Sequence, residues 1–207
     1  MNERNKARIS FFLYILLLLV FDTRYWFMIL NMFLAFAALE LSFLLPLFTG
    51  KSKKELPLNA FFYTVFILLS PNIFYVVTDL IHLNMFPFKF RQGLVLHEWW
   101  NFSVLTCGVL LAVYYFVLMH KQLQLLLSRL KWKKLIFLLF VLLSSIGIYI
   151  GRFLRFHTIH VFTEPLSVIR QFMDSVNGDS LLFIVYLSVL QLLVCWLFLD
   201  ARGAKHD

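Results

Sequence analysis

Residues 26–48 run WFMILNMFLAFAALELSFLLPLF, a stretch in which Glu40 is the single charged side chain. About 20 consecutive apolar residues are long enough to cross the hydrocarbon core of a bilayer as a helix. The whole chain has the same character, because 61% of its 207 residues are hydrophobic and 14% are charged. Soluble globular domains carry about 45 to 50% apolar and roughly 25% charged residues. The composition therefore predicts a polytopic membrane protein and excludes a soluble globular domain and a disordered chain.

Five further apolar runs accompany this segment and predict a six-helix transmembrane bundle, an all-α integral membrane protein that forms a single domain over residues 1–207. The expected spans cover residues 9–21, 26–48, 58–78, 99–119, 135–151 and 181–199. The first run is short and follows a basic start, as the apolar region of a signal peptide does. No small-residue cleavage site follows it, so we expect an uncleaved first helix.

Basic residues set the expected orientation, since Lys and Arg accumulate in the cytoplasmic loops of membrane proteins. With the N-terminus inside, 13 Lys and Arg residues fall on the cytoplasmic side and 6 on the outer side. We therefore expect both termini in the cytoplasm. The net charge of +8 comes from short clusters between apolar runs, which favours anionic lipid as a partner and argues against nucleic acid.

Two connections carry helical patterns. In residues 120–134, leucines recur every three or four positions among basic residues, which fits either a basic helix lying on an anionic leaflet or an extension of the fourth helix. In the long outer connection, Glu164-Pro165 begins and Asn177-Gly178 ends a periodic apolar pattern. This second pattern predicts a short amphipathic helix on the outer face.

The end of the third span carries an unusual polar stripe. Residues 70–83 run SPNIFYVVTDLIHL, and four polar side chains share one helical face within an arc of about 80°: Asn72, Tyr75, Asp79 and His82. An ionisable side chain within a span costs about 2.5 to 3.5 kcal/mol on insertion scales, so it should face protein or water. Pro71 frees the Ile67 carbonyl, so the alternative is a proline kink whose polar groups satisfy one another.

The fifth span ends in a basic counterpart, Gly151-Arg152-Phe153-Leu154-Arg155. Gly147 and Gly151 form the small-xxx-small spacing that lets another helix approach closely. A carboxylate stripe and a guanidinium stripe thus reach the same, outer side of the membrane. Asp79 and His82 are candidates for proton acceptors or ligands, Arg152 and Arg155 for holding an anionic group, and Asn72 and Tyr75 for orienting them.

Other polar residues give less specific signals. His157 and His160 could present two imidazoles on one helical face, but their spacing matches no defined zinc signature, so we expect no metal and no cofactor. Glu40 is either a proton or cation ligand, or a residue paired within the bundle, and we favour the pairing.

Three stretches resemble a bacterial family of predicted membrane proteins catalogued as domain-of-unknown-function family 1361. Residues 30–35 resemble its N-L-F-L-A segment, residues 71–83 its P-N-x-P-Y-x-x-T-D-x-x-H-L signature and residues 151–155 its G-R-x-x-R signature. Phe74 stands where the family has a second proline. Asn101 stands where the family usually has Asp, and His157 and His160 stand where it usually has Asn and Asp. The resemblance therefore implies no role that needs a carboxylate at these positions. The resemblance implies a multi-pass protein of the bacterial cell membrane and no established activity.

Three hypotheses for function remain open. The first is an outward-facing polar pocket that binds an anionic or lipid-linked ligand. The second is a non-catalytic scaffold that docks another membrane protein, with Asp79 and Arg152 as a structural ion pair. The third is a small transporter, for which Glu40 alone suggests a polar path to the inner side. Nucleotide-hydrolysis and serine-hydrolase motifs are absent from the sequence, so no reaction is assigned.

Overall fold

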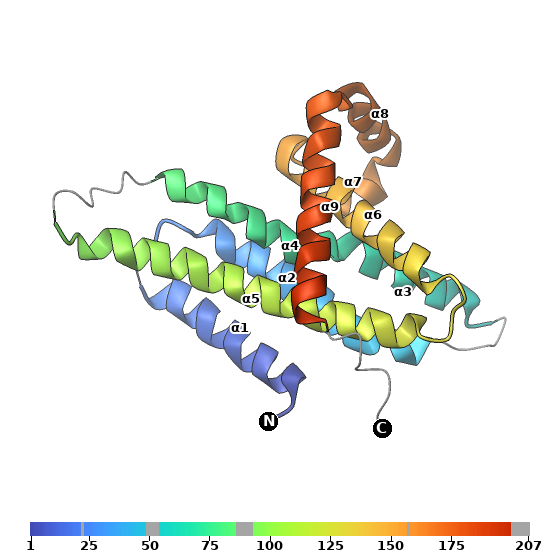
Figure 1. Ribbon diagram of the computed structural model, residues 1–207, viewed down its shortest axis with the longest axis horizontal. Coiled ribbons are helices and arrows are strands. Elements are labelled where there is room, and N and C mark those ends of the chain that lie inside the picture. Colours follow the sequence, from blue (N-terminus) through green and yellow to red (C-terminus); the bar gives the residue numbers. More distant parts are fainter. Residues whose placement is uncertain (22, 49–53, 86–92, 157, 200–207) are drawn as a thin grey trace.

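The computed structural model describes residues 1–21, 23–48, 54–85, 93–156 and 158–199. Every regular element in these ranges is helical (Figure 1). In chain order the elements are α1 (Glu3–Val20), α2 (Phe27–Leu44), the 3₁₀ turn η1 (Leu45–Phe48), α3 (Leu56–Leu69), α4 (Pro71–Thr78), the 3₁₀ segment η2 (Asp79–Met85), α5 (Leu96–Leu127), α6 (Lys133–Phe153), α7 (Thr158–Thr163), α8 (Pro165–Ser175) and α9 (Gly178–Phe198).

Five helical segments are long and apolar enough to cross a membrane: Phe27–Phe48, Leu56–Met85, Leu96–Leu127, Lys133–Phe153 and Gly178–Phe198. They correspond to five of the six predicted spans. The helix that corresponds to the first prediction, α1, begins six residues earlier than expected and is not among them. Its first turns carry Glu3, Arg4, Lys6 and Arg8, which lower its mean hydropathy.

The third predicted span is longer than its sequence pattern suggested, which corrects the expected boundary at Thr78. At Asp79 the backbone N–H bonds to the carbonyls of Val76 and Val77, so the helix tightens and continues as η2 to Met85. Tightening to i→i+3 bonds is common at helix ends and rarely extends far. Asp79 therefore lies inside a helical segment of 30 residues and not at its outer end.

Pro71 interrupts this segment as predicted, since α3 ends at Leu69 and α4 begins at Pro71. The Ile67 carbonyl, which Pro71 cannot serve, accepts a hydrogen bond from the Ser70 hydroxyl at 2.9 Å. The local polar groups at the break are thus satisfied within their own helix, as the proline-kink interpretation expected.

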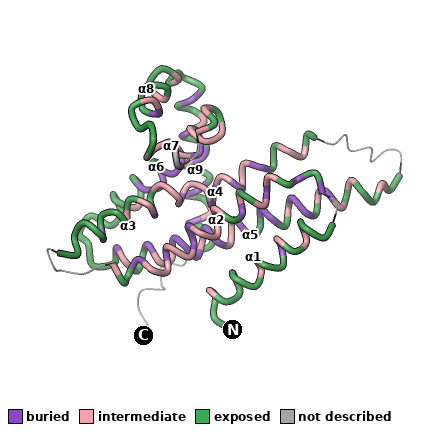
Figure 2. Tube along the Cα trace, turned by 180° about the vertical axis from the view of Figure 1, so that it is seen from behind, coloured by how far each residue is buried: buried purple, intermediate pink, exposed green. Residues whose placement is uncertain are grey.

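The centre of the molecule is formed by α2, α4 and α5 (Figure 2), where buried positions gather along the facing sides of the helices. On α2 the small residues Ala35, Ala38 and Ser42 are fully buried, so neighbouring helices approach closely. The helices α6 and α9 form an antiparallel pair that packs on α4 and α5, and α9 crosses the long direction of α5 steeply (Figure 1).

The helix that packs against Gly147 and Gly151 of α6 is α4. A Cβ at Gly147 would lie 2.7 Å from the Pro71 Cγ, and one at Gly151 would lie 3.4 Å from the Tyr75 ring. Contacts under about 3 Å force a shift of one side, so the close approach of α6 and α4 needs a glycine at position 147.

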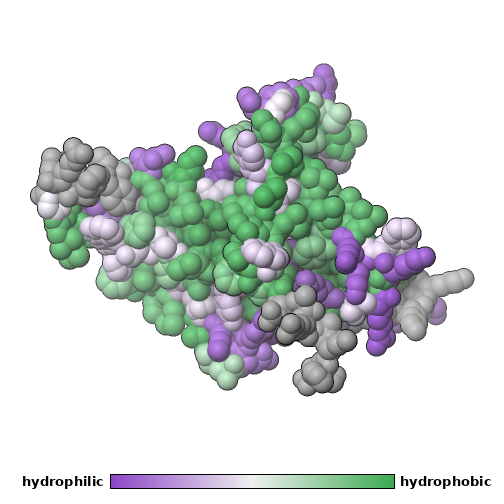
Figure 3. All heavy atoms as spheres, viewed as in Figure 1, coloured by the Kyte–Doolittle hydropathy of each residue, from purple (hydrophilic) through white to green (hydrophobic). Residues whose placement is uncertain are grey.

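The two patterned connections are both helical. Residues up to Leu127 continue α5 without a break, and Leu123 and Leu127 are buried, so the first pattern is an extension of the fourth predicted helix. The second pattern is confirmed as α8, which Asn177 separates from α9 by capping the α9 N-terminus. Apolar residues cover the middle of the face shown in Figure 3, and hydrophilic residues gather at its margins.

Candidate functional site

Asp79 lies at the meeting point of three elements and is fully buried. Its Oδ1 accepts a hydrogen bond from Arg152 Nη2 of α6 at 2.6 Å. Its Oδ2 accepts one from Asn31 Nδ2 of α2 at 2.8 Å. A buried carboxylate is tolerated only when its lone pairs are occupied and its charge is balanced. Both carboxylate oxygens meet this requirement, so the pair ties η2 to α6 and α2.

Arg152 is enclosed by the stripe that the sequence predicted. Its Nη2 also donates to the Thr78 hydroxyl at 2.5 Å and to the Tyr75 carbonyl at 3.4 Å. Its guanidinium carbon lies 4.1 Å from the centroid of the Tyr75 ring, within the range of a cation–π contact. With a side chain 16% exposed, Arg152 is held on one face by an aromatic ring and on one edge by oxygen acceptors.

His82 lies on the more open side of the pair. Its Nε2 is 3.7 Å from Asp79 Oδ1 and 3.4 Å from Arg152 Nη1, and its ring packs on Phe27 with a centroid distance of 4.5 Å. Its side chain is 32% exposed. The four residues Tyr75, Asp79, His82 and Arg152 therefore form one contact cluster, which we call the charged cluster, together with Asn31 and Thr78.

Two predicted site residues lie apart from the charged cluster in the contacts of the described chain. Asn72 donates to the Leu69 carbonyl of its own helix at 2.9 Å. That carbonyl lacks its usual donor because the Ile73 N–H bonds to the Ser70 carbonyl. Arg155 is exposed and has φ of 57°, a left-handed conformation that turns the chain away just after α6 ends.

His157 and His160 were the weak candidates for metal ligands. His157 lies outside the described residues, and the His160 ring lies 5.5 Å from that of Phe156. Within the described ranges, no group of three or more His, Cys, Asp or Glu side chains could hold a metal ion.

Asn31 and Thr78 were missed as site residues, although the sequence offered a signal for each. Asn31 shares one face of α2 with the small residues Ala35, Ala38 and Ser42, a pattern that indicates burial against another helix. Thr78 directly precedes Asp79 in the resembling stretch. Neither signal identified the partner, because helical periodicity assigns a residue to a face but not to the neighbouring helix.

Glu40 is paired, as we favoured from the sequence. Its Oε2 accepts from Arg4 Nη2 at 2.6 Å and from Arg8 Nη2 at 2.7 Å, and its Oε1 accepts from Arg8 Nε at 2.8 Å. These bonds join α1 to α2. Glu40 therefore has two cationic partners from one helix, which explains how an acidic residue is accommodated well inside α2.

Residues 30–194 match the family model described as a protein of unknown function, DUF1361. The chain belongs to this family. The match covers every member of the charged cluster, whereas α1 precedes it. No curated protein and no solved structure matches this DUF1361 chain. The family and its apolar helices agree with a membrane protein, and the ligand-binding role of the charged cluster stays a prediction.

Proposed function

We propose that this DUF1361 member is a six-span membrane protein whose charged cluster forms an outward-facing site for an anionic group, such as the phosphate of a lipid or of a lipid-linked ligand. The observation that supports this most is the pair of hydrogen-bonding side chains beside a single carboxylate. Asp79 lies beside Arg152 and the partly exposed His82, and Arg155 follows Arg152 by three residues. Arginine and histidine side chains recognise phosphate through charge-assisted hydrogen bonds.

The six-span arrangement is supported by the way α1 follows α5. Lys121 Nζ binds the Glu3 carboxylate at 2.8 Å, near the start of α1. Near its end, the Phe21 and Trp100 rings are 5.0 Å apart. The intervening stretch of α5 measures about 30 Å at 1.5 Å per residue, close to the thickness of the bilayer core. α1 therefore runs beside a spanning helix over the full depth of the core.

Exposed tryptophans support the placement of the membrane boundaries. Trp26 and Trp99 lie at the starts of α2 and α5, and Trp132 precedes α6. Tryptophan favours the membrane–water interface because its ring is apolar and its N–H is polar. In the proposed orientation, the first two mark the outer boundary, and Trp132 marks the inner boundary beside Lys131 and Lys133.

Each residue of the proposed site has a distinct task. Asp79 and Asn31 hold Arg152 in one position, and the Tyr75 ring limits its movement. An incoming anionic group would meet the partly exposed His82 first, and the exposed Arg155, which lies apart from the cluster, would contact the part of a larger ligand that extends beyond it. Arg152 would act through its Nη1 edge, which faces His82.

A non-catalytic scaffold is the second candidate, because both Asp79 oxygens already have partners. In that case the charged cluster would only join three helices, and the bundle surface would dock another membrane protein. The transporter hypothesis has lost its one indication, since Glu40 is engaged by Arg4 and Arg8.

The two candidates differ in what the side chains of His82 and Arg155 do. The full-length protein would be incorporated into nanodiscs with equal amounts of phosphatidylglycerol and phosphatidylcholine, and the retained lipid identified by native mass spectrometry. We expect enrichment of phosphatidylglycerol that falls in His82→Gln and in Arg155→Gln. Arg170→Gln is the matched control, since Arg170 is an exposed arginine on α8. Equal retention in all four proteins would favour the scaffold.

A further inference from the structure

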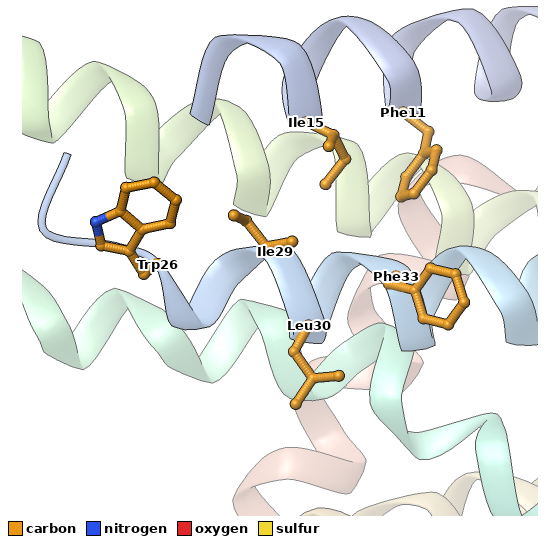
Figure 4. A pocket seen from close by; sticks show the side chains of 6 residues that line it. All are labelled: Phe11, Ile15, Trp26, Ile29, Leu30 and Phe33. Carbon is orange, nitrogen blue, oxygen red and sulfur yellow. The ribbon is translucent and has the colours of Figure 1, made fainter. Parts of the chain in front are cut away.

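A groove runs between α1 and α2, along the stretch of α2 that also carries Asn31 of the charged cluster. Its volume is about 390 Å³, and it is lined by Phe11, Ile15, Trp26, Ile29, Leu30 and Phe33. In Figure 4 the side chains of Phe11 and Ile15 point from α1 toward α2, and Trp26 lies at one end. Volumes of about 300 to 1,000 Å³ are typical of sites that bind small molecules.

We propose that this groove holds one acyl chain of a membrane phospholipid. The proposal rests on α1 lying in the bilayer beside α2, which is part of the proposed function, and it does not depend on a ligand at the charged cluster. Every lining residue is apolar. The neighbouring outward positions Phe12, Leu16 and Leu19 of α1 are 65%, 56% and 57% exposed, so the groove is continuous with a surface that faces hydrocarbon.

The two ends of the groove differ in a way that suits a phospholipid. Trp26 is 55% exposed at the outer end, where its indole can lie at the level of the head group. At the inner end the Phe11 ring stacks on Phe36, with centroids 4.2 Å apart and planes at 7°. The Glu40 pairs with Arg4 and Arg8 close α1 onto α2 beyond it. The groove is thus open toward the interface and closed toward the inner side.

The lining also distinguishes an acyl chain from another helix. Helices that associate in membranes do so through Gly, Ala, Ser and Thr, because small residues let two backbones approach. The groove has only large side chains on both walls. A flexible acyl chain can follow their uneven surface. A second copy of this protein would meet no stripe of small residues against which one of its helices could pack.

Photolabelling of the full-length protein tests the proposal. Vesicles would contain phosphatidylcholine and a phosphatidylcholine that carries a diazirine within its acyl chain, and labelled residues would be mapped by mass spectrometry. We expect labelling to concentrate at Ile15, Ile29 and Phe33 relative to the exposed α9 positions Val185 and Val189. Ile29→Trp should fill the groove and lower that labelling several-fold, and Ile15→Phe should do the same with a smaller change in shape.

Leu19→Trp is the matched control, because it adds the same side chain to α1 outside the groove, and it should leave the labelling unchanged. Arg155→Gln should also leave it unchanged, which separates this proposal from the one about the charged cluster. Labelling spread evenly over the groove and α9 would overturn the proposal. So would groove labelling that persists in Ile29→Trp and Ile15→Phe, or disulfide formation between copies of a Leu30→Cys variant.

Discussion

Arg152 Nη2 donates to Asp79 Oδ1 at 2.6 Å, and the fully buried carboxylate receives its second hydrogen bond from Asn31. The relationship joins residues 73 positions apart on two helices whose approach depends on glycine. The carboxylate and its partners come from α2, η2 and α6, so these hydrogen bonds link three helical segments. In a bilayer, where apolar surfaces give little specificity between helices, we expect such a contact to favour one packing over others.

Replacement of Asn31 by Ala should destabilise the protein by about 1.5 to 3 kcal/mol, because the fully buried Asp79 Oδ2 would lose its hydrogen bond. Asn72→Ala is the matched control, since Asn72 donates to the Leu69 carbonyl of its own helix. The free energy of unfolding in detergent micelles, measured for both variants, checks this. Equal losses would mean that Asn31 contributes no more than a local helix contact does.

Gly147→Leu should separate α6 from α4, since even a Cβ at this position would lie 2.7 Å from the Pro71 Cγ. We expect a lower midpoint of thermal unfolding and a weaker contact between Arg152 and Asp79. Gly178→Ala should be tolerated, because a Cβ there has no heavy atom within 4 Å. Thermal unfolding of both variants gives the comparison, and a Gly147→Leu protein as stable as the parent would refute this account of the helix contact.

Glu40→Gln should loosen the attachment of α1, because two arginines would lose their carboxylate. Glu3→Gln should have a smaller effect, since the Glu3–Lys121 pair is exposed and such pairs contribute about 0 to 1 kcal/mol. Hydrogen exchange of α1 amides in detergent should therefore rise clearly in the first variant and little in the second. Unchanged exchange in Glu40→Gln would show that apolar contacts alone hold α1.

The proposed orientation predicts which side of the membrane each connection faces. In a background without Cys107 and Cys195, single cysteines would be placed at the exposed residues Arg155 and Lys131. An impermeant thiol reagent added to intact cells should label only the first. Labelling of the second alone would invert the topology and move the charged cluster to the cytoplasmic side.

Much of this fold follows from the sequence, because apolar length and helical period are local properties. Five of the predicted spans coincide with spanning-length helices, and the polar stripe with Tyr75, Asp79 and His82 indicated a shared face. The pattern could not show that the continuation through Asp79 is a 3₁₀ helix, since 3₁₀ bonds leave no signature in residue types. It also could not show that Gly147 faces α4.

The candidate site was predicted only in part, because two of its expected residues lie at helix ends. Arg152 and Arg155 share a face only if the helix continues, but α6 ends at Phe153 and the left-handed Arg155 turns away. Asn72 belongs to the polar stripe by its position in the sequence. At the break before Pro71, however, its amide donates to the Leu69 carbonyl and not to a residue of the cluster. Both departures occur at helix ends, where backbone hydrogen bonding and not side-chain periodicity decides direction.

The coupling of Asp79 and Arg152 is tested most directly by a double-mutant cycle on the free energy of unfolding in detergent micelles. Asp79→Asn and Arg152→Gln should each cost about 3 to 5 kcal/mol, since each leaves the other residue in a buried site without its ionic partner. The double variant should lose less than the sum of the two, by at least about 0.5 kcal/mol. Additive losses would contradict the account, because they would show that the two side chains act independently.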